Sequence, residues 1–372
     1  MKVVILGGGI IGTSIAWRLA REGATVTVLE RARVGQEASW AAAGLIAPQA
    51  EAQGAGPFFD LCLRARDAFR EILPRLIEAS GVDPEYGPTG ILYLALDRAD
   101  HKELEARARW QRQAGGVVEE LTPAQARKLE PAIGHNTLHA LYMPEDRPLD
   151  NRKLTQSYAV AAVRAGAILS EGASADTILT TGGRASGIRL HDGSSLEADI
   201  VVVAAGAWSH SIRGLESDRL TLHPVRGQIV CFDGRPGLIG PPVFSSRGYL
   251  VPRRDGRILA GSTMEQAGFN RSVTLAGMEK IVSAALAMVP ALSNLAFREA
   301  WAGLRPATHD LLPVLGISPS LPNVIYATGH FRSGILLSAL TGEVIADLVA
   351  GRQPVIDLQP FSPARFSSGE PS

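Results

Sequence analysis

The chain has 372 residues and a mass of 39.4 kDa, which is long enough for two domains that share a large core. Its 37 basic residues balance its 37 acidic residues, so the charge favours neither a nucleic-acid nor a polyanion partner. Two cysteines, Cys62 and Cys231, argue against a disulfide framework, and we expect both to be small buried residues rather than reactive thiols.

Membrane and metal sites are not expected either. No apolar stretch reaches the length of a membrane-spanning helix, and a strand begins at residue 2 without a basic region before it. We therefore expect a cytoplasmic protein with no membrane partner. His101, His135 and His139 lack ligand spacing to acidic or cysteine residues, so we expect surface or hydrogen-bonded histidines and no metal site.

The first thirty residues carry the strongest signal in the chain. Residues 2–6 (KVVIL) are typical of a buried parallel strand, and they run directly into a G-x-G-x-x-G formed by Gly7, Gly9 and Gly12. Gly7 permits a tight turn, Gly9 lets the backbone approach a pyrophosphate, and Gly12 lets a helix pack closely on the strand. The free N–H groups at the start of that helix favour phosphate.

A second strand and an acidic residue complete this pattern. Residues 13–22 have helical spacing, Gly23 ends the helix, and residues 24–29 (ATVTVL) are typical of a strand. Glu30 follows eighteen residues after Gly12, where a carboxylate accepts hydrogen bonds from a ribose 2′-OH. The sequence therefore predicts an adenine dinucleotide at a site that includes Gly7, Gly9, Ile10, Ile11, Gly12, Glu30 and Arg31.

The segment 33–48 (RVGQEASWAAAGLIAP) is rich in small residues and has no clear period. Small side chains let the backbone come close to a planar ring, so Ser39 and residues 41–45 are candidates to line a flavin. An ordinary helix packed on the sheet explains the same composition equally well, and the two interpretations stay open at this point.

The rest of the chain alternates between the two periodicities. Helical spacing is present at residues 58–80, 101–114, 152–165, 275–289 and 335–350. Residues 122–125 open another helix, with Thr122 at the N-cap and Pro123 at the first position. A strand pair with a loop is expected at residues 167–178. Single strands are expected at residues 87–96, 187–190, 195–198, 200–204, 227–232, 248–252, 257–261, 297–306 and 323–328.

The apolar runs at residues 2–6, 25–29, 200–204 and 323–328 are typical of parallel strands, although they lie far apart in sequence. Turn-rich antiparallel segments lie between them. This order predicts an α/β fold, with a discontinuous Rossmann-like domain and a second α+β domain built on a mostly antiparallel sheet. We expect the first domain to comprise residues 1–84, 146–216 and 300–372, and the second to comprise residues 85–145 and 217–299.

Seven motifs occur together in the order of a known family. They are GGGIIG with Glu30, SWAAAGLIAP, IVVVAAGAWS, HPVRGQ, GYLVPRRDGRILAGSTME, WAGLRPAT and ATGHFRSGILLSALTG. Over residues 1 to about 350 the chain resembles glycine oxidases of the FAD-dependent D-amino-acid oxidase family. The resemblance implies a Rossmann-like FAD domain joined to an antiparallel substrate domain.

The resemblance also implies an activity, that of an FAD-dependent amino-acid oxidase. Such enzymes transfer hydride from the substrate Cα to flavin N5, and O2 then reoxidises the flavin and yields hydrogen peroxide. The imine product hydrolyses to an oxo-acid and ammonia. Substrates would be glycine or small amines and D-amino acids such as sarcosine, D-alanine and D-proline. Because neither cysteine lies in a motif for covalent attachment, we expect non-covalent FAD.

Three catalytic residues follow from the same motifs. Arg305 of GLRP matches the arginine that pairs with the substrate carboxylate, and Tyr249 of GYLVP matches the tyrosine whose hydroxyl touches the same group. Arg332 of GHFRSG matches a further arginine near substrate and flavin. Without the motifs, Arg305 would be read as a structural ion pair and Tyr249 as half-buried sheet packing. A guanidinium fork suits a carboxylate because it offers two hydrogen bonds.

The flavin-side residues implied by the resemblance fall in three groups. The first group lies along the flavin ring and the ribityl chain. The second group consists of a main-chain contact to adenine and the glycine that follows a buried strand. The third group lies at a helix start and surrounds the pyrimidine edge of the ring. In chain order they are Ser39, Ala43, Gly44, Leu45, Ala175, Gly206, His330, Phe331, Arg332, Ser333, Gly334, Ile335 and Leu336.

Two other functions stay open. A flavin dehydrogenase for D-amino acids or sarcosine would pass its electrons to a quinone or another acceptor, and a non-catalytic flavin-binding protein would be unaffected by loss of Arg305. The sequence does not rank the candidate amines, because pocket width depends on the strands around Arg247, Tyr249 and Met264. The resemblance also suggests a homotetramer and a role in thiamin thiazole synthesis.

Overall fold

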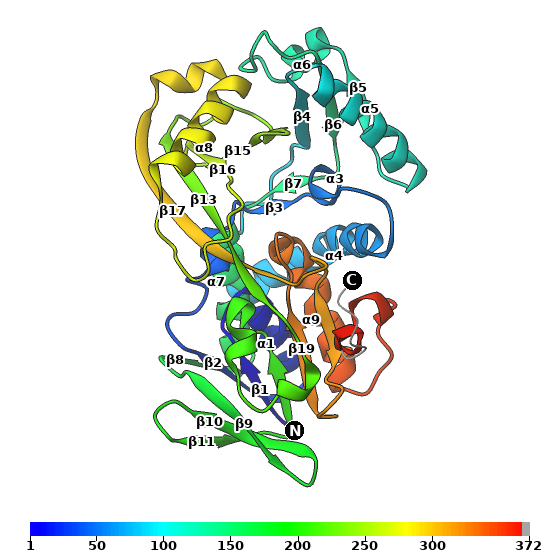
Figure 1. The fold of residues 1–372 in the computed structure, drawn as a ribbon, viewed down its shortest axis with the longest axis vertical. Helices are drawn as coiled ribbons and strands as arrows, with labels where there is room; N and C mark the ends of the chain where they lie inside the picture. The colour runs from blue at the N-terminus through cyan, green and yellow to red at the C-terminus, as the bar shows by residue number, and fades with distance from the viewer. Residues whose placement is uncertain (367–372) are drawn as a thin grey trace.

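A computed structural model describes residues 1–366, which form two large sheets with helices packed against them (Figure 1). The first sheet has six strands in the order β18-β19-β12-β1-β2-β8, all parallel except the edge strand β18. Its strands are β1 (Lys2–Leu6), β2 (Thr25–Glu30), β8 (Ile168–Glu171), β12 (Ile200–Val203), β18 (Val314–Ile317) and β19 (Val324–Thr328).

The central strands of this sheet are apolar because both of their faces are covered. On β1, Val3 and Ile5 pack among helices, whereas Val4 and Leu6 pack toward a small antiparallel sheet on the other face. The covering helices are α1 (Ile10–Arg21), α4 (Pro57–Ser80), α7 (Asn151–Arg164) and α9 (Gly334–Val349). The small sheet comprises β9 (Ala175–Thr181), β10 (Arg184–Leu190) and β11 (Ser195–Glu197).

The second large sheet has eight strands in the order β17-β13-β16-β15-β14-β4-β6-β5. Only the pair β4 and β14 is parallel, so the sheet is mostly antiparallel. Its strands are β4 (Ile91–Ala95), β5 (Glu119–Leu121), β6 (His139–Met143), β13 (His223–Asp233), β14 (Val243–Ser245), β15 (Gly248–Pro252), β16 (Arg257–Gly261) and β17 (Ala296–Ala307).

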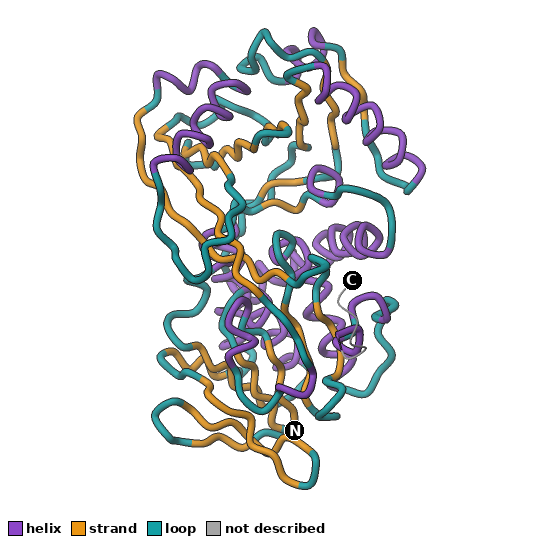
Figure 2. Tube along the Cα trace, in the orientation of Figure 1, coloured by secondary structure: helices purple, strands orange, loops and turns teal. Residues whose placement is uncertain are grey.

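Alternate residues of this sheet face opposite layers, as strand geometry requires. Leu250 and Ala260 pack toward α8 (Leu275–Met288) and α6 (Pro123–Leu129), whereas Val251 and Leu259 pack on the side of α5 (Arg98–Gln113). The long strands β13 and β17 run from this eight-stranded sheet toward the six-stranded sheet (Figure 2). They therefore connect the two bodies of the molecule, each of which consists of one large sheet and the helices packed against it.

Between the two bodies lie two single-turn helices, α2 (Ala38–Ala41) and α3 (Pro48–Glu51), and a two-stranded ribbon of β3 (Leu45–Ile46) and β7 (Arg147–Pro148). The segment 33–48 is therefore not one continuous helix. The predicted fold class is confirmed, and the proposed domain limit at residue 300 falls inside β17.

Some predicted elements differ from the observed ones. Helix α1 begins at Ile10 rather than at residue 13, because the glycine turn itself supplies the helix start. The segment 167–178 is not a strand pair: β8 joins the parallel sheet beside β2, and β9 belongs to the small antiparallel sheet. No helix in the described part of the chain combines the length and apolar content needed to cross a bilayer.

Candidate FAD and substrate site

A cavity of about 1350 Å³ lies between the two large sheets. Residues from the glycine turn and β2 line one end, and residues from β13, β15 and β17 line the other. The segment that carries α2 and β3 lies along the middle, together with the turn between β19 and α9. The cavity therefore spans the parallel sheet and the antiparallel sheet.

The glycine turn at the start of α1 is shaped by two close contacts. Gly7 has φ +108°, and a Cβ at Gly12 would lie 1.9 Å from the carbonyl oxygen of Gly7. A Cβ at Gly9 would instead meet only the Ser39 hydroxyl, at 3.2 Å. Gly7 and Gly12 are thus required by the turn and the helix packing, whereas Gly9 keeps the backbone open toward the cavity.

Glu30 ends β2 at the same end of the cavity. Its carboxylate accepts hydrogen bonds from the backbone N–H of Gly8 at 2.8 Å and of Ala32 at 2.9 Å. The N–H of Ala173 donates to the carbonyl of Glu30 at 2.9 Å, which brings the start of β9 and Ala175 beside this strand end. An adenosine here would have both an acceptor for ribose hydroxyls and a nearby main chain.

Three buried side chains hold the small-residue segment along the cavity. Asn151 Nδ2 donates to the carbonyl of Ser39 at 2.7 Å, and Trp301 Nε1 donates to the carbonyl of Ala41 at 3.0 Å. Arg253 Nη2 donates to the carbonyl of Ala43 at 3.0 Å. Side chains from three separate parts of the chain thus form hydrogen bonds with the carbonyl groups of this irregular backbone. These bonds keep the backbone in place although it does not form a regular helix.

The turn before α9 has a comparable support. Phe331 has φ +46°, and its N–H donates to the carbonyl of Pro306 at 2.9 Å. His330 is buried, and its Nε2 lies 3.2 Å from the Thr341 hydroxyl. Burial lowers the pKa of His330 to about 3, so the ring is neutral at physiological pH. Neither α1 nor α9 has an acidic residue in its first turn, so both helix N-termini favour an anion.

Arg305 and Tyr249 meet at the opposite end of the cavity. Arg305 Nη2 donates to the Ser262 hydroxyl at 2.7 Å, and Nη1 donates to the carbonyl of Thr263 at 3.1 Å. These bonds leave further guanidinium donors for an anionic ligand. Burial lowers the pKa of Arg305 and raises the pKa of Tyr249, so the phenol stays protonated and able to donate. A carboxylate would be bound by both groups.

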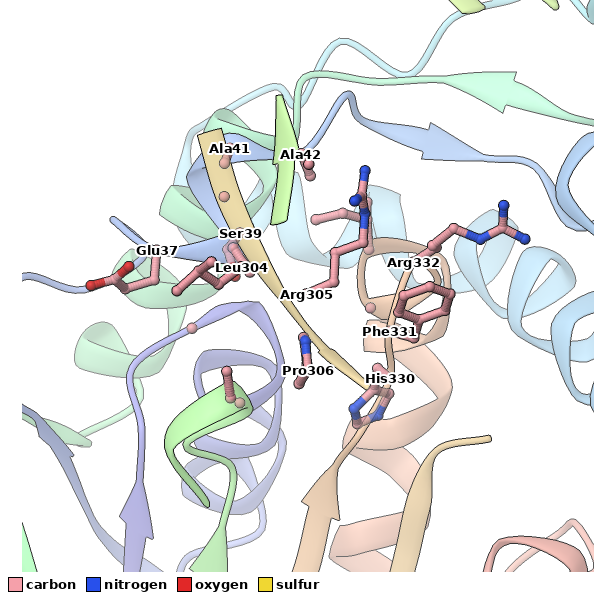
Figure 3. A pocket seen from close by; sticks show the side chains of 18 of the residues that line it. Glu37, Ser39, Ala41, Ala42, Leu304, Arg305, Pro306, His330, Phe331 and Arg332 are labelled. Atoms are coloured by element: carbon pink, nitrogen blue, oxygen red, sulfur yellow. The ribbon is translucent and has the colours of Figure 1, made fainter. Parts of the chain in front are cut away.

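Arg332 lies at the edge of this end. Its side chain extends away from that of Arg305 (Figure 3). Its Nη2 donates to the carbonyl of Glu51 at 3.1 Å, and about a third of the side chain (32%) is exposed. In this conformation the guanidinium braces a neighbouring turn rather than a ligand held by Arg305.

The cavity brings together nineteen of the 22 predicted site residues. Gly12, Ser333 and Leu336 do not line it: Gly12 packs on Gly7, and the other two belong to the start of α9. Those that line it are Gly7, Gly9, Ile10, Ile11, Glu30, Arg31, Ser39, Ala43, Gly44, Leu45, Ala175, Gly206, Tyr249, Arg305, His330, Phe331, Arg332, Gly334 and Ile335.

Glu51 was missed by the sequence reasoning. It lines the cavity from α3, near Arg305 and Arg332, although no motif singles it out. One signal was available, since Glu51 is the only charged residue between Glu37 and Asp60. A lone carboxylate in a segment of small and apolar residues is unusual enough to examine.

These features fit an FAD molecule. The open backbone at Gly9 and the start of α1 would hold the pyrophosphate, Glu30 the ribose, and the segment 39–45 with the turn 330–335 the ring. Groups of three or more metal-ligating side chains do not occur within residues 1–366.

Comparison with known proteins agrees with this geometry. The model of the DAO family, described as FAD dependent oxidoreductase, matches residues 2–348. Glycine oxidase of Geobacillus kaustophilus is 34% identical over 98% of this chain and 96% of its own length. A crystal structure of glycine oxidase from Geobacillus kaustophilus superposes with a TM-score of 0.93 at 32% identity, covering 98% of both chains.

A longer relative matches as well. The bifunctional protein ThiO/ThiG of Synechocystis sp. is 35% identical over 98% of this chain, which spans only 54% of that protein. The similarity therefore covers the chain almost completely in each comparison, and the resemblance predicted from the seven motifs is confirmed. The chain therefore belongs to the DAO family of FAD-dependent oxidoreductases.

Proposed function

We propose that the chain catalyses the FAD-dependent oxidative deamination of glycine and other small amino acids, with O2 as electron acceptor. The family membership and the glycine oxidase relatives support this activity. The observation that carries it is the half-buried guanidinium of Arg305, held by Ser262 and Thr263 with donors left over, at the end of the cavity opposite the dinucleotide turn.

Bound FAD supplies the hydride acceptor for the Cα–H bond, and O2 reoxidises it to give hydrogen peroxide. The residues of the chain then have mainly a positioning role. Arg305 binds the substrate carboxylate in a fork, and the protonated hydroxyl of Tyr249 donates to the same group. Fixing the carboxylate at two points orients the Cα–H bond, and alignment is the main requirement of a hydride transfer.

A titration of the purified protein tests this function. Glycine, sarcosine, D-alanine and D-proline are added separately without oxygen while the flavin absorbance is followed, and air is then admitted and peroxide is assayed. We expect at least glycine to bleach the flavin and peroxide to appear with air. No bleaching by any of the four would contradict an amino-acid substrate, and bleaching that persists in air would contradict O2 as acceptor.

The remaining predictions belong to the same proposal. We propose that FAD is bound without a covalent link, since neither Cys62 nor Cys231 lines the cavity; acid precipitation should release the flavin into the supernatant. The catalytic roles of Arg305, Tyr249 and Arg332, the cofactor contacts and the domain limits stay predictions. The homotetrameric state also stays a prediction, and light scattering tests it. The same holds for a role of the reaction product in thiamin thiazole synthesis.

A further inference from the structure

The substrate end of the cavity carries a carboxylate as well as guanidinium groups. Glu51 is the last residue of α3, and it lines the cavity on the side of Arg332. Arg305 and Arg332 are close enough to Glu51 for their positive charges to act to lower the pKa of its carboxyl. A small amino acid is a zwitterion, so a site with a cation and an anion matches both of its charged groups.

The short helix that presents Glu51 is held by side-chain hydrogen bonds at both of its ends. Asp146 Oδ2 accepts the N–H groups of Gln49 at 3.0 Å and Ala50 at 2.9 Å. Arg107 Nη1 donates to the carbonyl of Ala52 at 2.7 Å, and Gln111 Nε2 donates to that of Gln49 at 2.7 Å. Asp146 and Gln111 are fully buried, so a single turn of helix is fixed from both of its ends.

The carboxylate itself is left without a close partner. Arg332 donates to the backbone carbonyl of Glu51, and its Nε lies 4.0 Å from Oε2, which is too long for a hydrogen bond. Among residues 1–366 no donor hydrogen-bonds to either carboxylate oxygen, and 24% of the side chain remains accessible. Both oxygens are therefore available to a ligand.

The other acidic residues that line the cavity are all engaged. Glu30 accepts two backbone N–H groups, and Glu37 pairs with Arg31 and Arg271. Glu103 pairs with Arg107, and Glu279 accepts from Ser283. Glu51 differs from these four because its backbone is fixed while its charge is uncompensated at hydrogen-bond distance.

We propose that the Glu51 carboxylate binds the ammonium group of the substrate and accepts one of its protons, while Arg305 holds the substrate carboxylate. The proton moves from the substrate nitrogen to a carboxylate oxygen, which frees the nitrogen lone pair and leaves Glu51 as a neutral acid. No electron is transferred in this step. The neutral amine is the form from which hydride can leave, because its lone pair stabilises the resulting iminium. The inference rests on the proposed function and names the group that prepares its substrate.

The surroundings of Glu51 suit a proton acceptor. Burial raises the pKa of the Glu51 carboxyl, and the two arginines oppose that rise. A raised pKa makes the carboxylate a better base than an exposed glutamate. The charged groups that act on the Glu51 carboxyl are Arg332 before α9 and Arg305 on β17. The other titratable groups near it are Tyr249 on β15, Cys62 on α4 and Asp146 before β7, and burial and the Glu51 charge both raise the pKa of each.

Binding of two unreactive ligands tests the inference directly. 2-Aminoisobutyrate has an ammonium group but no Cα–H bond, so it cannot react. 2-Hydroxyisobutyrate has the same carboxylate and nearly the same size, but a neutral hydroxyl replaces the ammonium group. We expect the FAD-loaded wild type to bind the amino ligand more tightly in calorimetry. Glu51→Gln should weaken the amino ligand by about 10- to 100-fold and leave the hydroxy ligand unchanged, since hydrogen bonds to charged groups have that magnitude.

Glu279→Gln is the matched control, because Glu279 also lines the cavity but lies on the exposed side of α8. It should bind both ligands as the wild type does. Equal affinity of the wild type for the two ligands would overturn the inference, and so would an equal loss of both in Glu51→Gln. Flavin content and the thermal midpoint of Glu51→Gln should match the wild type, which separates this effect from misfolding.

The pH profile of glycine oxidation gives a second measurement. In Glu51→Gln the acid limb of kcat/KM should move to higher pH than in the wild type, because only substrate that has already lost its ammonium proton in solution can then react. An unchanged acid limb would contradict proton transfer to Glu51. If no amine bleaches the wild-type flavin, the proposed function fails, whereas bleaching in the wild type with unaltered binding in Glu51→Gln removes only the role of Glu51.

Discussion

Gly227 on β13 illustrates how one position decides what its neighbour can do. A Cβ at this position would lie 2.2 Å from Nη1 of Arg305, so the guanidinium occupies space that any other residue would fill. Arg305 pairs across the strands with Val225, and its side chain lies over the glycine two residues further along β13. The position of the substrate arginine therefore depends on a missing side chain on the adjacent strand.

Arg305→Lys should impair substrate binding although the charge is kept. A lysine has three donors on one nitrogen and offers no fork, so it cannot bind a carboxylate through two parallel hydrogen bonds and also keep the bonds to Ser262 and Thr263. We expect KM for glycine to rise by about 10- to 100-fold with normal flavin content. Arg298→Lys is the control, because Arg298 lies on the same strand with half of its side chain exposed (51%) and should leave KM unchanged. A normal KM in Arg305→Lys would contradict carboxylate binding by the fork.

His330 makes a prediction about stability and pH. Its pKa in the folded protein is about 3, below the 6.5 of an unfolded histidine, so the unfolded chain binds a proton first as the pH falls. Stability should therefore decrease between about pH 6.5 and pH 3, by at most about 1.4 kcal/mol per pH unit. In urea unfolding from pH 7 to pH 4, His330→Gln should lose less stability than the wild type. Exposed His135→Gln should follow the wild type.

At the scale of elements, the turn from β1 into α1 separates folding from cofactor binding. Gly12 lies against the Gly7 carbonyl, whereas Gly9 borders the cavity. The two glycines have the same residue type and lie three positions apart, but their surroundings differ. One is required by the packing of helix on strand, and the other keeps room for a ligand.

The two alanine variants should therefore fail in different ways. Gly12→Ala places a Cβ 1.9 Å from a backbone oxygen, so we expect little folded protein. Gly9→Ala should fold with normal circular dichroism, because its nearest contact is at 3.2 Å, and should bind FAD at least tenfold more weakly, because the methyl group occupies phosphate space. Flavin titration of the apoprotein measures this. Normal FAD affinity in Gly9→Ala would place the pyrophosphate elsewhere.

At the scale of the whole molecule, the cavity is lined by both large sheets, and β13 and β17 connect them. A cofactor in this cavity contacts elements that are otherwise covered by different helices. Because FAD binds the folded chain and not the unfolded one, its binding free energy adds to the stability of both bodies together.

Removal of FAD should consequently lower the thermal midpoint of the whole chain. At free FAD about 1,000-fold above Kd the stabilisation is about 4 kcal/mol, and the midpoint should rise with FAD concentration. Calorimetry of apoprotein and reconstituted protein measures the shift, and NAD at the same concentration should produce none. A shift confined to one of two separate transitions would show that the cofactor contacts one body only.

The sequence by itself determined the dinucleotide turn and the two kinds of sheet. Gly7, Gly9, Gly12 and Glu30 belong to one contiguous strand–turn–helix–strand unit, so their relative positions follow from local geometry alone. Apolar runs and alternating runs distinguished the parallel strands from the antiparallel ones, because the number of covered faces decides the pattern.

Only the tertiary structure decided which distant residues share the cavity. Arg305, Tyr249 and Glu51 come from β17, β15 and α3, and their meeting depends on strand order rather than on spacing along the chain. The motifs predicted Arg305 and Tyr249 as site residues. Glu51 becomes a candidate only in the structure, where the side chains of Asp146 and Arg107 fix the helix that carries it. Long-range hydrogen bonds of this kind leave no periodicity in a sequence, because each partner is set by packing.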